Sequence, residues 1–362
     1  FVWHFQQNLD FLIAPSMPYS HERATLLKLL LIPAILLGVL GGLRDVWNFA
    51  FTSPQKPRAL VEEVRSLLEL PQDFFGSGYD TVDLLATGNE EVESLKLNFM
   101  LDTGLTTSLL LPETAKELGL VEGRLLGHQT PKVILENVHF SDLHIGPLRP
   151  FVNDFFQSRM GNGTLIHGML GMEFFEKFAV DLGTEIRLYQ ADDGDKVAKM
   201  EDMECLTTAP LPARLLGVLL CVPGNDACVK GVLDTGASFS VLNWAAAEVL
   251  LHAVKADKDV MLRERGGVTS LDANGQALLM PTLEAQFELR GAGQDPPGTW
   301  TPDPIEVAVG DIASFHQIFG DTMEPLALIG QDILTQRRTL LAARQRLLCF
   351  HSSRIARKGD QR

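Results

Sequence analysis

The feature that most constrains this chain is a tripeptide that occurs twice, Asp-Thr-Gly at 102–104 and again at 234–236. An apolar run precedes each copy, L-K-L-N-F-M-L in the first case and K-G-V-L in the second. Ordinary residue frequencies give one such tripeptide about 0.08 times by chance in a chain of this length, and two independent ones about 0.003 times. Chance occurrence of the same tripeptide in two surface turns is therefore a poor explanation, and we predict a duplicated unit.

The residues around both tripeptides follow the same order, which indicates an internal repeat over about 78–190 and 207–351. In each copy a second apolar strand and a helix follow, then a long β-rich region, an apolar pair ending in Gly, a short helix and a final strand. The acidic stretch 191–206 between the copies reads as a loop-like linker. A chain of 362 residues is long enough for two domains and an appendage.

The two aspartates have the character of an acid–base pair. Hydrolysis of a peptide bond without a metal needs one group to activate water and another to protonate the substrate. Two carboxyls about 3 Å apart share one proton, so the pair supplies both. Gly next to each carboxyl lets a backbone N–H approach it, and Thr supplies a hydroxyl that can tie one loop to the other. We therefore expect Asp102 and Asp234 to meet.

Three segments carry a resemblance to a known family: V-L-D-T-G-A-S-F-S-V-L, L-I-G-Q-D-I-L-T and M-L-G-M-E-F-F-E-K-F-A-V-D-L. Both copies resemble lobes of the retropepsin-like aspartic protease family, over roughly 80–190 and 207–350. The resemblance implies a mainly β fold, with lobe 1 at 78–190, lobe 2 at 207–351, each a β-barrel, and a cleft between them. It also implies peptide-bond hydrolysis of polypeptide substrates, with no homodimer needed to complete the site. The implied site residues are the dyad Asp102 and Asp234, the hydroxyl lock Thr103 and Thr235, and the loop residues Gly104, Gly236 and Ala237.

Two features depart from the family pattern. Leu105 stands after the first motif, where a small residue such as Ala237 is usual, and a leucine there could crowd the dyad. The hairpins that would close over substrate have no clear family sequence; the candidates are Gly123–Thr130 and Gly266-Gly267. The sequence thus leaves an alternative open: a catalytically silent, protease-like accessory subunit of a membrane protein complex.

The N-terminal part predicts a membrane anchor. Fifteen uncharged residues run from Leu29 to Leu43, and the flanks extend the apolar segment to a transmembrane helix at 25–51. A leftover signal sequence or a buried hairpin helix remains possible. We expect an N-terminal segment at 1–24, a linker with a short helix at 52–77, and a basic tail at 352–362. Because the chain starts at Phe1, we expect a processed or partial product. An organellar or an endomembrane location fits equally.

Composition excludes some classes of function. The net charge of −15 argues against a nucleic-acid partner. No cofactor fingerprint appears, and no metal is expected, because His128, His139, His144 and His167 lack metal-ligand spacing. Cys221 and Cys228 flank a predicted hairpin, where they form either a disulfide or two buried thiols.

Overall fold

The computed structural model describes a subset of the chain, and all structural statements below refer to it. The described residues are 81–87, 94–120, 131–140, 143–153, 165–183, 186–271, 277–293, 298–320 and 324–354. Several predictions lie outside them: the N-terminal segment 1–24, the transmembrane helix 25–51, the linker 52–77 and the hairpin candidate Gly123–Thr130. Within the described ranges no helix is long and apolar enough to cross a membrane.

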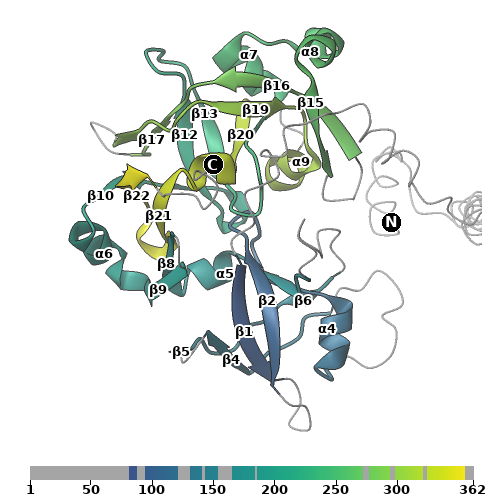
Figure 1. Ribbon diagram of the computed structural model, residues 1–362, viewed down its shortest axis with the longest axis vertical. Helices are drawn as coiled ribbons and strands as arrows, with labels where there is room; N and C mark the ends of the chain where they lie inside the picture. Colours follow the sequence, from purple (N-terminus) through teal and green to yellow (C-terminus); the bar gives the residue numbers. More distant parts are fainter. Residues whose placement is uncertain are drawn as a thin grey trace, which may run out of the picture. The chain divides into compact units, whose positions relative to one another are not determined.

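The described part is mainly β, as the sequence predicts, and its strands form three sheets (Figure 1). Short helices connect and flank these strands. The helices are α4 (Pro112–Glu117), α5 (Met172–Phe175), α6 (Gly194–Met200), α7 (Trp244–Leu251), α8 (Lys258–Arg265), α9 (Ala313–Phe319) and α10 (Gln331–Leu334).

The first sheet has seven strands in the order β5-β4-β1-β2-β7-β3-β6 and contains the first Asp-Thr-Gly copy. Strand β2 forms because alternate apolar residues, among them Leu97 and Phe99, bury one face. It pairs in parallel with β7, and β7 pairs antiparallel with β3. The strands are β1 (Thr81–Thr87), β2 (Leu95–Leu101), β3 (Leu109–Leu110), β4 (Asn137–Phe140), β5 (Leu143–His144), β6 (Phe151–Val152) and β7 (Gly168–Leu170).

The second sheet has ten strands and contains the second copy, in the order β15-β16-β19-β14-β20-β13-β12-β17-β18, with β11 paired to β12. The pairing around the motif repeats that of the first sheet: β13 is parallel to β20, and β20 is antiparallel to β14. The strands are β11 (Ala209–Pro210), β12 (Leu216–Cys221), β13 (Cys228–Leu233), β14 (Val241–Leu242), β15 (Gly267–Leu271), β16 (Ala277–Ala285), β17 (Glu288–Arg290), β18 (Thr299–Trp300), β19 (Ile305–Val309) and β20 (Leu326–Ile329).

The third sheet joins segments from both copies in the order β10-β22-β21-β8-β9. Strand β21 of the second copy pairs with β8 of the first, and Arg338 on β21 donates from Nε and Nη2, one edge of its guanidinium group, to both carboxylate oxygens of the buried Asp181 on β8. This ion pair fixes the register between the copies, because a buried carboxylate is costly without such a partner. The strands are β8 (Phe178–Leu182), β9 (Ile186–Gln190), β10 (Met203–Thr207), β21 (Arg337–Ala342) and β22 (Leu347–Arg354).

Two local expectations were wrong. The stretch 191–206 is ordered rather than loop-like: a short 3₁₀ turn at Ala191–Asp193 leads into α6, and β10 begins at Met203. Its acidic residues are not a sign of disorder, because Val197 and Ala198 of α6 pack into a small core with Leu340. Strand β22 also extends to Arg354, so residues 352–354 of the expected basic tail belong to a sheet.

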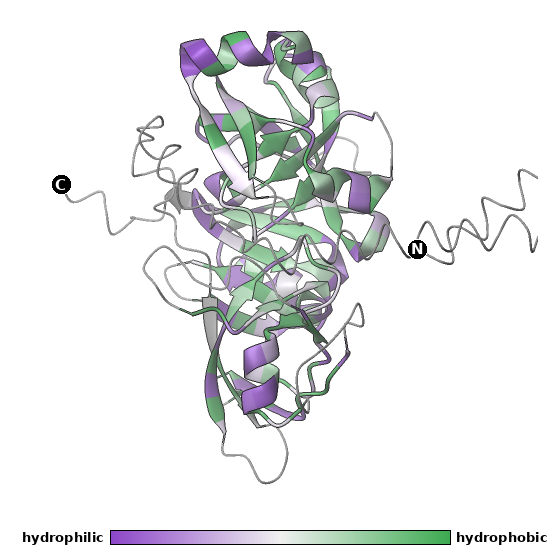
Figure 2. Cartoon of the chain, turned by 90° about the vertical axis from the view of Figure 1, so that its right-hand side faces the viewer, coloured by the Kyte–Doolittle hydropathy of each residue, from purple (hydrophilic) through white to green (hydrophobic). Residues whose placement is uncertain are grey.

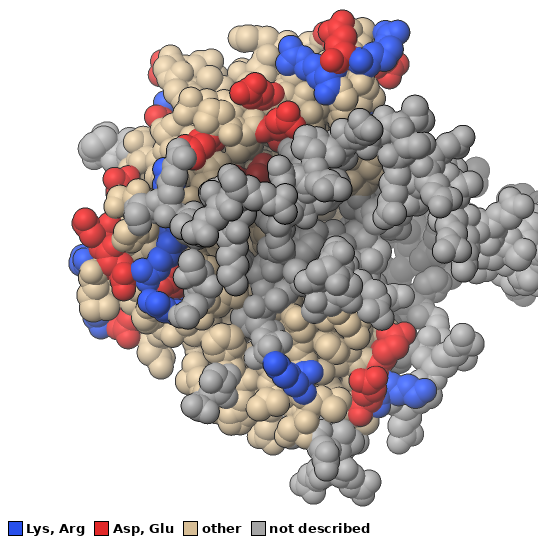
Figure 3. Space-filling view, in the orientation of Figure 1, with Lys and Arg blue, Asp and Glu red and all other residues tan. Residues whose placement is uncertain are grey.

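The barrel form expected for the lobes needs correction as well. In the described ranges each sheet has two end strands that do not pair with each other, so all three sheets are open. Their apolar faces still bury a continuous core that runs from Leu84 to Phe350. Figure 2 shows this division, with hydrophobic residues on the inner strands and hydrophilic ones on the outer helices. On the face seen in Figure 3, acidic and basic side chains are interspersed.

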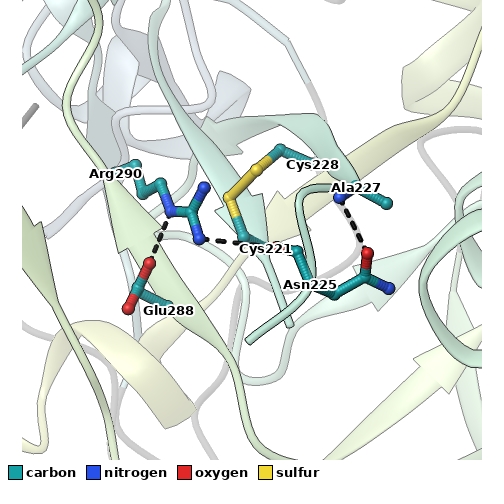
Figure 4. The surroundings of a disulfide bond; sticks show 6 residues. All are labelled: Cys221, Asn225, Ala227, Cys228, Glu288 and Arg290. Atoms are coloured by element: carbon teal, nitrogen blue, oxygen red, sulfur yellow. Dashed lines mark hydrogen bonds and ion pairs between the residues drawn. A yellow bond between two sulfur atoms is a disulfide. The ribbon is translucent and has the colours of Figure 1, made fainter. Parts of the chain in front are cut away.

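Disulfides join all four cysteines, so none is free. Cys221 and Cys228 face each other across the β12–β13 hairpin, and of the two states that the sequence allows the structure has the disulfide (Figure 4). Asn225 shapes the turn, accepting a hydrogen bond from the Ala227 N–H at 3.0 Å. The second disulfide, Cys205–Cys349, ties β10 to β22 across 144 residues of chain, which sequence reasoning did not anticipate.

Candidate active site

Each aspartate of the two motifs lies just beyond the end of a buried strand. Asp102 follows β2 and Asp234 follows β13. The parallel neighbour fixes the main chain at that point: the N–H of Asp102 donates to Leu170 O at 3.0 Å, and the N–H of Asp234 donates to Ile329 O at 3.0 Å. Because the same bond forms in both copies, the two carboxyls are presented from matching positions.

The structure brings these two carboxyls together. They share a side-chain hydrogen bond. In addition, the Gly104 N–H donates to Asp102 Oδ1 and the Gly236 N–H donates to Asp234 Oδ1, each at 2.8 Å. Each glycine also packs against the opposite carboxyl: a Cβ on Gly104 would lie 2.6 Å from Asp234 Cγ, and one on Gly236 would collide with Asp102. Glycine is thus required at both positions, because each main chain passes too close to the opposite carboxyl to leave space for a Cβ atom.

The electrostatic surroundings raise the pKa of both carboxyls. Burial and the neighbouring charge of Asp234 raise the pKa of Asp102 well above its ordinary value, against the lowering effect of the Gly104 N–H. Burial raises the pKa of Asp234 too, while hydrogen bonds from the Gly236 N–H and from Asp102 lower it. Asp102 is 8% exposed. Both carboxyls therefore hold protons more strongly than a free aspartate, and the two share one proton and titrate as a pair.

The two threonines bind each other's loop in a reciprocal arrangement. The Thr103 N–H donates to Thr235 Oγ1 and the Thr235 N–H donates to Thr103 Oγ1, both at 3.0 Å. Each hydroxyl donates in turn to the opposite strand, Thr103 to Leu233 O at 2.8 Å and Thr235 to Leu101 O at 2.9 Å. Both side chains are fully buried. These four bonds fix the loops, and with them the carboxyls, relative to one another.

A further layer supports the loops, and sequence reasoning missed it. The Ser240 N–H and hydroxyl both donate to the Asp332 carboxylate, at 2.9 and 2.7 Å, and Ser240 Oγ accepts from the Gly330 N–H. The first copy has the same layer: the Ser108 N–H donates to Glu173 Oε1, and Ser108 Oγ accepts from the Gly171 N–H.

The signal was present in the sequence, because a serine stands six residues after each aspartate and an acidic residue two residues after each later glycine. Burial raises the pKa of Asp332 to about 6, although its hydrogen bonds from Ser240 lower it. Gln331 beside it is fully buried and donates to Thr235 O at 2.7 Å, which adds support beneath the threonine pair.

Leu105 does not distort its loop. Its N–H donates to Asp102 O at 3.3 Å, as the N–H of Ala237 donates to Asp234 O at 3.3 Å. Its side chain packs against a small cluster that includes Met100, Ile166 and Met169. The leucine therefore fills a local core, and its N–H bond to Asp102 O matches that of Ala237 to Asp234 O.

The second hairpin candidate does lie on a hairpin. Gly266 ends α8 with a positive φ of 78°, and β15 and β16 follow as an antiparallel pair. Val268 and Met280 of this pair are buried against Phe239, five residues beyond Asp234. The hairpin is therefore packed onto the second loop, next to the candidate site.

In the described part of the chain, no group of three or more His, Cys, Asp or Glu side chains could hold a metal ion. The site consists of carboxyls, hydroxyls and backbone N–H groups, which suits acid–base chemistry.

Comparison with known proteins points the same way. Residues 89–174 match the family model of aspartyl proteases. This segment contains the first motif, and the match supports an aspartic-protease type of function in general. No curated protein matches the chain. Among solved structures, similarity is found to conglutin gamma, a basic 7S globulin from lupine seeds, and to basic 7S globulin from soybean, with TM-scores of 0.39 and 0.40. Each is 9% identical over 76% of this chain and 96% of its own length, and we draw nothing from so distant a likeness.

Proposed function

We propose that this protein is an aspartic endopeptidase whose dyad is Asp102 and Asp234. The observation that carries the proposal is the reciprocal placement of two hydrogen-bonded carboxyls on loops that the threonine pair locks together. A buried pair of this kind serves no evident structural purpose, because two uncharged side chains would avoid the cost of burying carboxyls. A site that retains two buried carboxyls despite this cost in stability is a candidate for a catalytic site.

The geometry supports a division of labour within the pair. The ionised carboxyl accepts a proton from a water held between the two side chains. The other carboxyl, which holds the shared proton, donates it to the carbonyl oxygen that becomes negative as the water attacks. The Gly104 and Gly236 N–H groups stay on the inner carboxylate oxygens and keep both side chains in position. As the C–N bond breaks, the carboxyl that took the proton of the water gives it to the leaving amine nitrogen, and the other carboxyl regains its proton from the hydroxyl that becomes the new carbonyl oxygen. The pair thus returns to its starting state.

The substrate in this proposal is an extended polypeptide that lies across a cleft between two lobes, each of which supplies one aspartate. Both aspartates belong to one chain, so no second copy is required to complete the pair. No metal or organic cofactor has a role in the proposed steps.

The proposal includes a membrane tether at 25–51, which only the apolar sequence supports. The protein would then act on polypeptides near that membrane, or associate with a membrane-protein partner, in an organellar or endomembrane location. The two disulfides favour a compartment that keeps thiols oxidised. Carbonate extraction tests the tether: retention in the membrane pellet is expected, and release as soluble protein would contradict it.

The activity test uses the full chain in detergent micelles with a mixed peptide library between pH 4 and 7. Asp102→Asn and Asp234→Asn are compared with Asp192→Asn, an exposed carboxylate on the surface. We expect cleavage by the wild type and by Asp192→Asn, and none by either dyad variant. A folded wild type that cleaves nothing at any pH would overturn the proposal in favour of the silent accessory subunit. Cleavage that survives in both dyad variants would reveal a contaminating peptidase.

A further inference from the structure

Two histidines face each other on the β4–β5 hairpin, at the edge of the seven-stranded sheet. His139 on β4 lies directly opposite His144 on β5. Nε2 of His139 and Nδ1 of His144 are 3.3 Å apart, and the rings meet edge to face with centroids 4.8 Å apart. Within the described residues neither ring has another hydrogen-bond partner. Two ring nitrogen atoms therefore lie side by side at the surface, and the tautomers of the rings decide which of them carries the proton of their hydrogen bond.

The spacing of these nitrogens suits one class of ligand. Zinc binds imidazole nitrogen at about 2.0–2.1 Å, and two such bonds to nitrogens 3.3 Å apart enclose an angle of about 107°. A tetrahedral site has about 109°, whereas a square-planar site at the same bond length would bring the nitrogens to about 2.9 Å. To aim both lone pairs at the ion, the rings turn about χ2, which is a broad torsion for histidine.

His144 is exposed on an end strand, so one side of the pair faces solvent. On the other side the row across the sheet continues through Leu85, opposite His139, to Lys96, opposite Leu85. The apolar Leu85 separates the imidazoles from that ammonium group.

We propose that His139 and His144 form a two-ligand site for Zn²⁺, which clamps the β4–β5 hairpin and keeps its remaining coordination positions open to water. The sequence spacing of five residues matches no helical ligand pattern, and only the hairpin register brings the rings together. The site lies on β4 and β5, separated from the dyad strand β2 by β1 in the sheet order. It is therefore independent of the proposed peptidase activity.

The test measures zinc binding to the full chain in detergent at pH 7.5, by titration against a chromophoric chelator. Wild type is compared with His139→Ala, His144→Ala, the double variant and His252→Asn. His252 is an exposed histidine with a positive φ of 55°, a conformation that asparagine tolerates, so His252→Asn is a matched control. His139→Gln is a second variant that preserves side-chain size at the hairpin.

We expect each single hairpin variant to weaken binding of one zinc equivalent about tenfold or more, and the double variant to lose that equivalent. Zinc should also raise the melting temperature of the wild type and of His252→Asn, and have a smaller effect on the double variant, because the clamp is gone. Equal stoichiometry and affinity in wild type and double variant would overturn the site. An equal loss in His252→Asn would overturn its assignment to the hairpin.

Discussion

The two Asp-Thr-Gly copies hold their aspartates with the same hydrogen bonds but surround them with different side chains. Beyond the bonds already described, the N–H of Met172 donates to Leu105 O at 2.7 Å, and the N–H of Gln331 donates to Ala237 O at 2.8 Å. Most of these contacts use backbone groups or the side chains of Asp, Thr and Ser, and the exceptions are the side chains of Glu173 and Gln331. A few polar residues therefore position the carboxyls. The positions do not depend on which apolar side chains pack behind the two loops.

The differences between the copies lie in packing and helix capping. Where the first copy has Leu105 and Thr107, the second has Ala237 and Phe239, so the bulky residue moves by two positions and each local core stays filled. Asn243 caps α7, accepting from the Ala246 N–H at 2.8 Å, whereas the matching Leu111 gives α4 no side-chain cap. The first copy thus relies on apolar packing where the second relies on hydrogen bonds.

The most stringent test of whether the two copies are equivalent is to remove one carboxyl at a time. Asp102→Asn and Asp234→Asn should each reduce peptide cleavage by about 10²–10⁴-fold, because either change leaves the pair without an acid or a base. Initial rates at the optimum pH, with Asp192→Asn as control, measure this. If one dyad variant retains most of the activity, the copies are not equivalent partners in the chemistry.

The same variants should be more stable than the wild type at pH 7. The pKa of each aspartate is raised in the folded state, so the fold binds protons that the unfolded chain releases. The free energy of unfolding therefore falls as pH rises through the raised pKa values of the two aspartates. An asparagine side chain does not titrate in this range, so the substitution removes that loss of stability. A higher melting temperature for Asp102→Asn at pH 7, with a smaller gain at pH 4, is the expected result.

Removing one hydroxyl of the threonine pair should have the next largest effect. Thr103→Val keeps the shape but leaves Leu233 O and the Thr235 N–H buried without partners, and Thr235→Val does the same to Leu101 O and the Thr103 N–H. Each should lower the free energy of unfolding by about 2–6 kcal/mol, at about 1–3 kcal/mol for each of the two orphaned groups. Urea denaturation measures this, with Thr103→Ser as the control that keeps the hydroxyl. A cost confined to one of the two valine variants would contradict the reciprocal arrangement.

The sequence predicted the parts of the fold that a short motif encodes. The strand before each Asp-Thr-Gly, the strand and helix after it, and the second strand ending in Gly171 or Gly330 all appear, because apolar runs and fixed glycines leave little choice locally. The structure also places all seven predicted site residues, from Asp102 to Ala237, in the two loops that meet. Their catalytic role and the division into two lobes stay predictions.

What the sequence could not give depends on contacts between distant segments. The five-stranded sheet combines β8, β10 and β21, whose pairing no local pattern specifies. The same holds for Cys205–Cys349, for the hydrogen bonds from Ser240 to Asp332, and for the facing histidines of the β4–β5 hairpin. The packing of Leu105 could not be predicted for a related reason, since its cluster includes residues more than 60 positions away.

Exchanging the bulky residues between the two copies tests whether their local cores are interchangeable. Leu105→Ala should cost about 1–3 kcal/mol by opening a cavity against Met100 and Met169. Ala237→Leu should cost about 1–3 kcal/mol by overpacking the cluster around Phe239. The double variant Leu105→Ala/Thr107→Phe imports the arrangement of the second copy and should recover part of the first loss. Thermal denaturation measures all three, and no recovery in the double variant would show that the two cores are not interchangeable.

The smallest effect concerns the acidic residue behind each loop. The pKa of Asp332 is raised to about 6, above the usual value of about 3.9 for an unfolded chain. Between these values the folded state holds a proton that the unfolded state releases, so the free energy of unfolding falls as pH rises from about 4 to 6. The full shift corresponds to about 3 kcal/mol, which we reduce to about 1–2 kcal/mol because Asp332 is partly exposed.

Asp332→Asn should remove that slope, whereas Glu173→Gln changes the matching residue of the first copy and serves as its control. The measurement is urea denaturation at pH 4.5 and 7 in the Asp102→Asn/Asp234→Asn background, where the dyad contributes no titration of its own. If the free energy of unfolding depends on pH in Asp332→Asn as it does without this substitution, the two hydrogen bonds from Ser240 fully compensate the cost of burying the Asp332 charge. A slope that disappears would show that the second loop is held most firmly in mild acid, which is where a dyad with raised pKa values keeps its shared proton.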